Sequence, residues 1–190
     1  MRIILAVLIL LPTIALSQYS ARVSYSQGNP TYRWIYSSES VDLSVMYATS
    51  EQWKFGLTIA WQYLMLNSDG NQGIMTPLSI SARYYTSEKG LRGYFEGQAG
   101  IVRRYYHYLN YSKFNPSDEV VLTGWNSAIH YAPLYGLGLG AAIPLEPSWE
   151  LNLGMQIDVS PKGFQRSNID ANVRDGFSQT RLLIGIEYKL

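Results

Sequence analysis

The chain has 190 residues, with 15 Lys and Arg against 14 Asp and Glu, and it contains no cysteine. This near balance lacks the basic excess that draws proteins to nucleic acid, and a chain without cysteine is not a small disulfide-held scaffold. The 16 tyrosines and 5 tryptophans favour β-strands and membrane–water interfaces.

The N-terminal segment has the pattern of a secretory signal. Met1 and Arg2 precede the apolar run IILAVLILLPTIAL, and Ala15-Leu16-Ser17 follows the small-x-small cleavage pattern. An uncleaved anchor is the alternative, but the run is shorter than the roughly 20 residues that a transmembrane helix needs. We predict a signal peptide over residues 1–17 and one mature domain over residues 18–190.

Beyond the signal, the chain shows repeated alternation of apolar and polar residues and no competing helical period, which predicts an all-β domain. In chain order, the eight predicted strands cover residues 19–25, 41–48, 53–63, 78–85, 94–106, 135–145, 149–159 and 181–190. Eight is an even number, as in single-chain bacterial outer-membrane barrels, and the best strands have the roughly 9–11 residues that a membrane crossing needs.

The strand from Trp149 shows the pattern at its clearest. Leu151, Leu153 and the following odd positions form one apolar face, whereas Asn152 and the other even positions form a polar face. In a membrane barrel the apolar face meets lipid and the polar face meets the lumen. The alternative is an exported lipocalin-like barrel or sandwich, in which the apolar face would point inward.

The predicted connections are of two kinds. Short ones cover residues 49–52, 87–93 and 146–148, and the others include the long polar stretches 110–128 and 160–179. Short periplasmic turns and longer extracellular loops are typical of outer-membrane barrels. We therefore predict an eight-stranded antiparallel up-and-down transmembrane β-barrel in the outer membrane of a Gram-negative bacterium, surrounded by outer-membrane lipids, with both termini periplasmic.

The interior of such a barrel is narrow enough for side chains to fill it. Inward glycines at positions 136, 138 and 140 would make room for long side chains from the neighbouring strands, including Glu96, Gln98, Glu150, Asn152 and Gln156. Buried charges must be paired, so we predict a lumen charge network that closes the barrel; a narrow charged channel is the alternative. Its members are Arg22, Asp42, Lys54, Arg83, Glu96, Arg104, Glu150, Asp158, Arg181, Glu187 and Lys189.

Aromatic residues mark the expected membrane interfaces. Trp53 and Trp149 adjoin short turns, and Tyr105 and Tyr108 would belong to the outer girdle. Alternatively, the strand that begins at Tyr94 continues past the bilayer and offers its edges to an extracellular ligand.

Arg103 falls on the predicted lipid face near the outer interface. There it could bind a phosphate of lipopolysaccharide. The alternative is a β-bulge that turns the side chain inward.

The segments "GLGLGAAIPLEPSWELNLGMQIDV" and "TRLLIGIEYKL" resemble the small outer-membrane β-barrel family of the OmpA/OmpX type, over the whole mature chain. The resemblance implies a C-terminal assembly signal formed by Tyr188 and Leu190 and recognised by the barrel-assembly machinery. Leu190 departs from the phenylalanine with which the family usually ends.

Some small barrels are enzymes, and the lipid A deacylases place a His-x-Ser motif on a late strand. Here the equivalent stretch is Asp158-Val159-Ser160, and the only histidines are His107 and His130. We therefore predict no catalytic residue, no cofactor and no metal, and a structural or surface-interaction role. A lipid A-modifying hydrolase is the alternative.

Overall fold

The structure, a computed structural model, describes residues 18–30, 35–66, 72–113, 120–161 and 177–190. Within them the chain forms eight antiparallel strands that close into one barrel in sequence order. The predicted signal peptide lies outside the described residues, and no helix among those described is long and apolar enough to cross a membrane. The strands are β1 (Tyr19–Pro30), β2 (Ile35–Ala48), β3 (Trp53–Leu66), β4 (Gln72–Tyr85), β5 (Arg92–Lys113), β6 (Val120–Glu146), β7 (Trp149–Ser160) and β8 (Phe177–Lys189).

Pairing between the first and last strands closes the barrel. Ser20 lies opposite Lys189 and Tyr25 lies opposite Ile184 in a continuous antiparallel register. The backbone N–H of Leu190 adds a hydrogen bond of 2.9 Å to the carbonyl of Tyr19. This seam leaves no sheet edge along the paired stretch, as a bilayer requires, because unsatisfied backbone groups in hydrocarbon cost several kcal/mol each.

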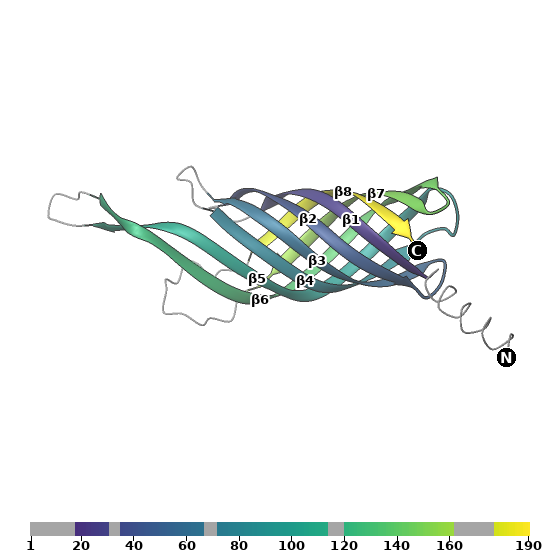
Figure 1. Ribbon diagram of the computed structural model, residues 1–190, viewed down its shortest axis with the longest axis horizontal. Coiled ribbons are helices and arrows are strands. Elements are labelled where there is room, and N and C mark those ends of the chain that lie inside the picture. The colour runs from purple at the N-terminus through teal and green to yellow at the C-terminus, as the bar shows by residue number, and fades with distance from the viewer. Residues whose placement is uncertain (1–17, 31–34, 67–71, 114–119, 162–176) are drawn as a thin grey trace, which may run out of the picture.

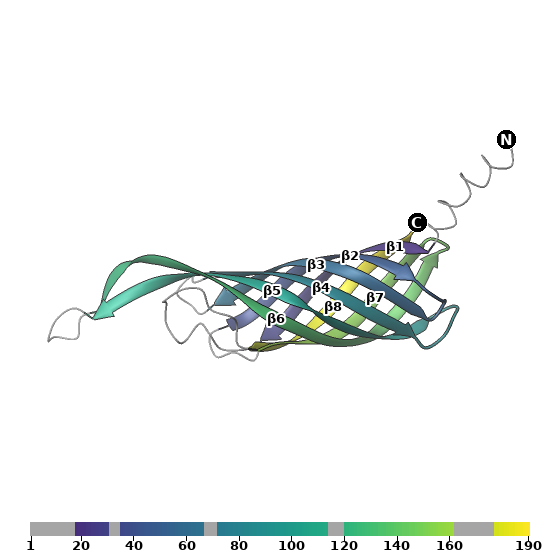
Figure 2. The ribbon, with the colours of Figure 1, turned by 90° about the horizontal axis from the view of Figure 1, so that it is seen from below.

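The short connections gather at one end of the barrel, where β1 begins and β8 ends (Figures 1 and 2). They cover residues 49–52, 86–91 and 147–148, and we call this the short-turn end and the opposite one the loop end. Gly90, in the second of these turns, has a φ of 72°, a left-handed conformation that glycine adopts without strain.

Side chains alternate strictly between the two faces of the wall. Each residue of β1 changes from exposed to buried and back, from Tyr19 to Pro30. The exposed face is apolar, as Leu137 at 74% exposure illustrates, whereas the buried face holds Asn152 and most of the charges. A soluble barrel has the opposite arrangement, so the lipocalin-like alternative is wrong.

Aromatic residues frame this apolar face at both ends. At the short-turn end the ring centres of Trp53 and Tyr84 are 5.0 Å apart and those of Trp149 and Tyr188 are 4.6 Å apart. Trp61 lies exposed toward the loop end, eight residues after Trp53, which is about 27 Å along the strand. After a strand tilt of about 35–45°, this spacing corresponds to about 19–22 Å across the membrane, slightly less than the apolar band of about 25 Å in outer-membrane barrels.

The strands β5 and β6 extend well beyond the others as a long hairpin (Figure 1). They contain 22 and 27 residues and remain paired out to Lys113 and Val120. The predicted loop over residues 110–128 is therefore wrong, because only residues 114–119 lie outside these strands. The predicted loop over residues 160–179 is also too long, since β8 begins at Phe177.

Candidate functional site

The centre of the lumen is organised around Arg83, whose side chain has no exposed surface. Its Nη2 lies 2.5 Å from Oε2 of Glu96 and its Nη1 lies 3.5 Å from Oε2 of Glu187. Nη1 also donates a hydrogen bond of 2.7 Å to the side-chain oxygen of Asn152. One guanidinium from β4 thus connects acceptors on β5, β7 and β8 across the barrel.

Both carboxylates have a second cation. Glu96 forms an ion pair of 3.1 Å with Arg22 of β1, and Glu187 forms one with Lys54 of β3. Ser20 adds a hydrogen bond of 2.6 Å to Glu187. We call Arg22, Lys54, Arg83, Glu96 and Glu187 the ionic network; paired and hydrogen-bonded charges of this kind are the form in which ions persist in a protein interior.

A smaller group of charges lies nearer the short-turn end. Arg92 and Lys189 contact the same oxygen of Glu150 at 2.5 Å and 2.7 Å. Lys189 is 39% exposed, so it occupies the rim and not the enclosed lumen. Sequence reasoning missed Arg92 because it placed this residue in a turn, yet β5 begins there and the side chain is buried.

Two buried tyrosines fill the space beside these charges. The guanidinium of Arg83 lies 4.1 Å from the ring centre of Tyr94, and that of Arg92 lies 4.0 Å from the ring centre of Tyr85. Cationic groups over an aromatic face are attracted by its quadrupole. Sequence reasoning did not single out either tyrosine, although the alternation places Tyr94 on the same face as Glu96.

The inward glycines make room for specific neighbours. A Cβ at Gly136 would come within 2.6 Å of Gln98, one of the predicted neighbours, whereas a Cβ at Gly140 would come within 2.2 Å of the Leu153 carbonyl and within 2.5 Å of the Tyr94 ring. Gly138 is less crowded, since its nearest contact would be a carbonyl at 3.3 Å. Thus Gly140 accommodates a tyrosine and not one of the polar side chains expected from the sequence.

A second ionic group surrounds Arg181 toward the loop end. Its Nη1 lies 3.1 Å from Asp42 and its Nε lies 2.7 Å from Asp158. Asp158 also accepts hydrogen bonds from Gln98, Gln156 and Gln179.

Between the two ionic groups the lumen contains a cavity of about 10 Å³, lined by Arg22, Ser24, Asn152 and Gln156 among others. A space of this size holds about one water molecule. The side chains of the described residues therefore leave little free volume at this level of the lumen.

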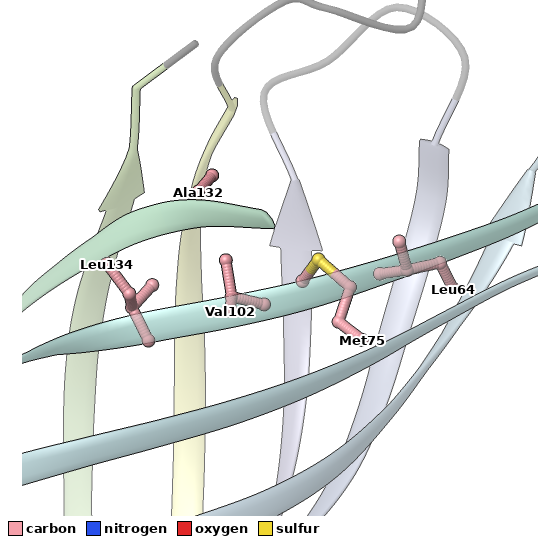
Figure 3. Close-up of a cluster of buried hydrophobic side chains, with 5 residues drawn as sticks. All are labelled: Leu64, Met75, Val102, Ala132 and Leu134. Carbon is pink, nitrogen blue, oxygen red and sulfur yellow. The ribbon is translucent and has the colours of Figure 1, made fainter. Parts of the chain in front are cut away.

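Toward the loop end, beside the Arg181 group, the lumen also has an apolar part. Leu64, Met75, Val102, Ala132 and Leu134 are all buried and form one cluster, which we call the apolar cluster. They come from β3, β4, β5 and β6, as Figure 3 shows. Sequence reasoning placed charged residues, polar residues and glycines in the lumen and did not identify this apolar cluster.

The outward face near the loop end carries Arg103, which is exposed. It lies opposite Thr76 on one side and Tyr131 on the other in a regular register, so the bulge that would turn it inward is absent from this part of the described strand. Tyr105 shares this face and is half-buried. Tyr108 lies beyond His107, the last β5 residue paired with β4, and its side chain is outside the described part.

The predicted equivalent of a catalytic serine is buried. Ser160 donates a hydrogen bond of 2.7 Å to the carbonyl of Pro133 and also contacts Arg104. The side chains of His107 and His130 lie outside the described part. No group of three or more His, Cys, Asp or Glu suited to a metal occurs among the described residues.

No family model matches the sequence, and no curated protein matches it. Solved structures do match. Neisserial surface protein A (NspA) is 12% identical with a TM-score of 0.66, over 91% of this chain and 97% of that one. Ail, the attachment invasion locus protein of Yersinia pestis, is 13% identical with a TM-score of 0.54, over 90% and 96%.

The outer membrane enzyme PagL is 11% identical with a TM-score of 0.56, over 86% of this chain and 97% of that one. Enzymes and other proteins thus share this architecture, so the fold does not assign a task. The apolar outward face and the closed antiparallel strands agree with these matches. The chain has the fold of the small eight-stranded outer-membrane β-barrels of the OmpA/OmpX type.

Proposed function

We propose that this protein is a sealed, non-enzymatic outer-membrane barrel that presents the β5–β6 hairpin at the cell surface. The short-turn end and both termini face the periplasm, and the loop end faces outward. The observation that carries the sealed lumen is the ionic network, in which Arg83 alone bridges β4 to β5, β7 and β8. An open conduit would require these paired, buried groups to separate.

Conductance separates the sealed barrel from the narrow channel. The purified protein, refolded into planar bilayers, is expected to show no steady opening events, because side chains fill the lumen. Arg83→Ala with Glu96→Ala would widen the lumen at its centre and serves as the comparison. Steady openings of the unaltered protein would overturn the sealed lumen.

The hairpin supports a role in surface interaction. On the side away from β5, β6 is paired with β7 only from Tyr135 onward, so on that side residues 120–134 have no strand partner among the described residues. On the other side of the hairpin, β4 covers β5 as far as His107. An open strand edge is a template for β-addition, in which backbone hydrogen bonds bind an extended segment of another molecule.

The hairpin role is tested by replacing residues 106–128 with a short turn. The shortened barrel is expected to fold in the membrane. Cross-linking probes at Ile129 and Tyr131 are expected to capture partner proteins in the intact form and not in the shortened one. If the same proteins are captured with and without the hairpin, the surface-interaction role is wrong.

Catalysis is the second candidate, because the outer membrane enzyme PagL shares the fold. Against it, Ser160 has no exposed surface and its hydroxyl bonds a backbone carbonyl, whereas a nucleophilic serine needs an adjacent base and access to substrate. Mass spectrometry of lipid A from cells with and without the protein is expected to show identical species. A change that Ser160→Ala abolishes would establish an enzyme.

We also propose that Tyr188 and Leu190 serve as the signal for the barrel-assembly machinery. Both side chains are exposed on the outward face at the short-turn end. Because they take no part in filling the lumen, they remain available to another protein while the barrel is being formed. Replacing both with serine is expected to leave the chain unfolded and protease-sensitive in the periplasm.

A further inference from the structure

The outward face of the barrel has a depression over β4 and β5. Its volume is about 900 Å³ and its lining is apolar. It continues toward the short-turn end into a second depression of about 460 Å³, with Ala82, Gly97 and Leu137 lining both. We call the joined depressions the outer pit.

The strand register explains the shape of the outer pit. Ala82 lies opposite Gly97, so two minimal side chains meet on adjacent strands. Phe55 lies on the far side of Ala82 and Leu137 on the far side of Gly97. The large side chains form walls around a floor of small ones, and Ala99 extends this floor toward the loop end.

Packing within the protein does not require glycine at position 97. A Cβ there would meet nothing nearer than a Leu137 methyl at 4.0 Å, whereas at Gly100 it would lie 2.1 Å from a backbone carbonyl. The only glycine with a positive φ among the described residues is Gly90. Because glycine weakens a strand unless another group approaches closely, the space above Gly97 suits an external occupant.

Arg103 supplies the charge at the loop-side end of the same face. It is three outward positions beyond Gly97 on β5, about 20 Å along the strand. Of the cationic side chains that the structure describes in the eight strands, Arg103 alone lies exposed on the outward face. The hydroxyl-bearing residues Thr76 and Tyr131 are its cross-strand neighbours.

We propose that the outer pit and Arg103 form a binding site for a phosphorylated lipid of the lipid A class. One acyl chain lies over Ala82, Gly97 and Ala99, and a phosphate oxygen accepts hydrogen bonds from the Arg103 guanidinium. Arginine suits phosphate because its planar fork donates two parallel bonds. The placement of the phosphate in the outer leaflet rests on the proposed orientation of the barrel.

The test uses full-length protein refolded in phosphatidylcholine vesicles, to which lipid A is added before detergent extraction and native mass spectrometry. Arg103→Gln is expected to lower lipid A retention about tenfold, the effect of losing one charged hydrogen bond, with phosphatidylcholine retention unchanged. Gly97→Leu fills the pit floor and is expected to lower lipid A retention while the barrel stays heat-modifiable.

Matched variants distinguish this site from general adhesion to an apolar wall. Ala99→Leu is compared with Ala21→Leu, the same change on the outward face of β1, and Arg103→Gln with Glu39→Gln. Equal loss of lipid A in both members of either pair would overturn the site. So would a dimer that Gly97→Leu disrupts, because the pit would then be an interface between copies. If the unaltered protein did not form a heat-modifiable barrel, that result would instead contradict the proposed function as an outer-membrane barrel.

Discussion

The two halves of the lumen share one register but differ in chemistry, because the loop-end half holds the apolar cluster beside the ionic group of Arg181. Toward the short-turn end, Arg83, Glu96 and Glu187 fill the interior as paired ions. Toward the loop end, Leu64 and Val102 are equally buried but belong to the apolar cluster. Alternation therefore identifies which side chains point inward. The chemistry of these inward side chains changes along the barrel axis.

The two halves should also respond differently to substitution. Removing one partner of a buried ion pair leaves a charge without compensation in a region of low dielectric constant. Removing carbon from the apolar cluster leaves a cavity, whose cost depends on how far the neighbours can relax.

Deleting residues 187–190 should abolish the barrel. The deletion removes Glu187 from the ionic network and the β8 residues that pair with the start of β1. Unsatisfied backbone groups at an open seam cost several kcal/mol each in hydrocarbon. The expected product is a protease-sensitive chain without heat-modifiable mobility on gels; a folded, membrane-inserted truncation would show that closure does not depend on this seam.

Arg83→Met should lower the free energy of unfolding of the barrel by about 3–5 kcal/mol, because Glu96 and Glu187 each lose a cation while remaining buried. Urea unfolding in lipid vesicles measures the change. The loss in the Arg83→Met, Glu96→Gln double variant should be smaller than the sum of the two single losses, because the Arg83–Glu96 ion pair is removed in both single variants. An additive double variant would mean that the two residues do not interact.

Val102→Ala should cost about 2 kcal/mol, from two lost carbons and the cavity they leave. Val102→Thr keeps the shape and adds a hydroxyl, so it should also destabilise if the surroundings are apolar. Thr58→Val is the matched change in the polar region, where Thr58 hydrogen bonds Ser44 at 2.9 Å. A neutral Val102→Thr would show that the polar interior reaches the loop end.

Gly138→Leu should destabilise the barrel by about 1–3 kcal/mol, the usual cost of overpacking. Gly138 borders the cavity of about 10 Å³ between the ionic groups, which is too small for a leucine side chain. Urea refolding reports the change. A neutral result would reveal more free lumen space than the structure has and would favour the channel.

The strands that cross the apolar band could be predicted closely from the sequence. β3, β7 and β8 alternate leucine, isoleucine or aromatic residues with polar ones because lipid lies on one side and the lumen on the other. The pairing of β8 with β1 follows from the need to eliminate sheet edges in a bilayer, and the structure shows this pairing.

The strand ends beyond the band could not be predicted. β1 continues to Pro30 through Gln27 and Asn29, which face outward but are polar. Where both faces of a strand meet water, alternation disappears. For the same reason the paired residues of the β5–β6 hairpin were assigned to a loop, although its tyrosines did suggest an extended strand.

The alternation pattern also identified most of the inward charged residues, but it could not identify which residues they contact. Arg83 contacts both Glu96 on the adjacent strand and Glu187 across the barrel; the second contact depends on barrel curvature and side-chain length. Arg92 was missed because the start of β5 was placed two residues late. The apolar cluster was missed because its members come from four strands whose inward chemistry changes along their length.

The most direct test of the central claim is to measure which face of β7 meets lipid. Because the chain has no cysteine, single cysteines at positions 151, 152, 153, 155 and 156 can each carry a fluorescent probe in refolded protein. A barrel whose apolar face points outward predicts strong quenching by brominated lipid at 151, 153 and 155, and little at 152 and 156. Quenching at 152 and 156 instead would contradict a membrane barrel with a polar, sealed interior.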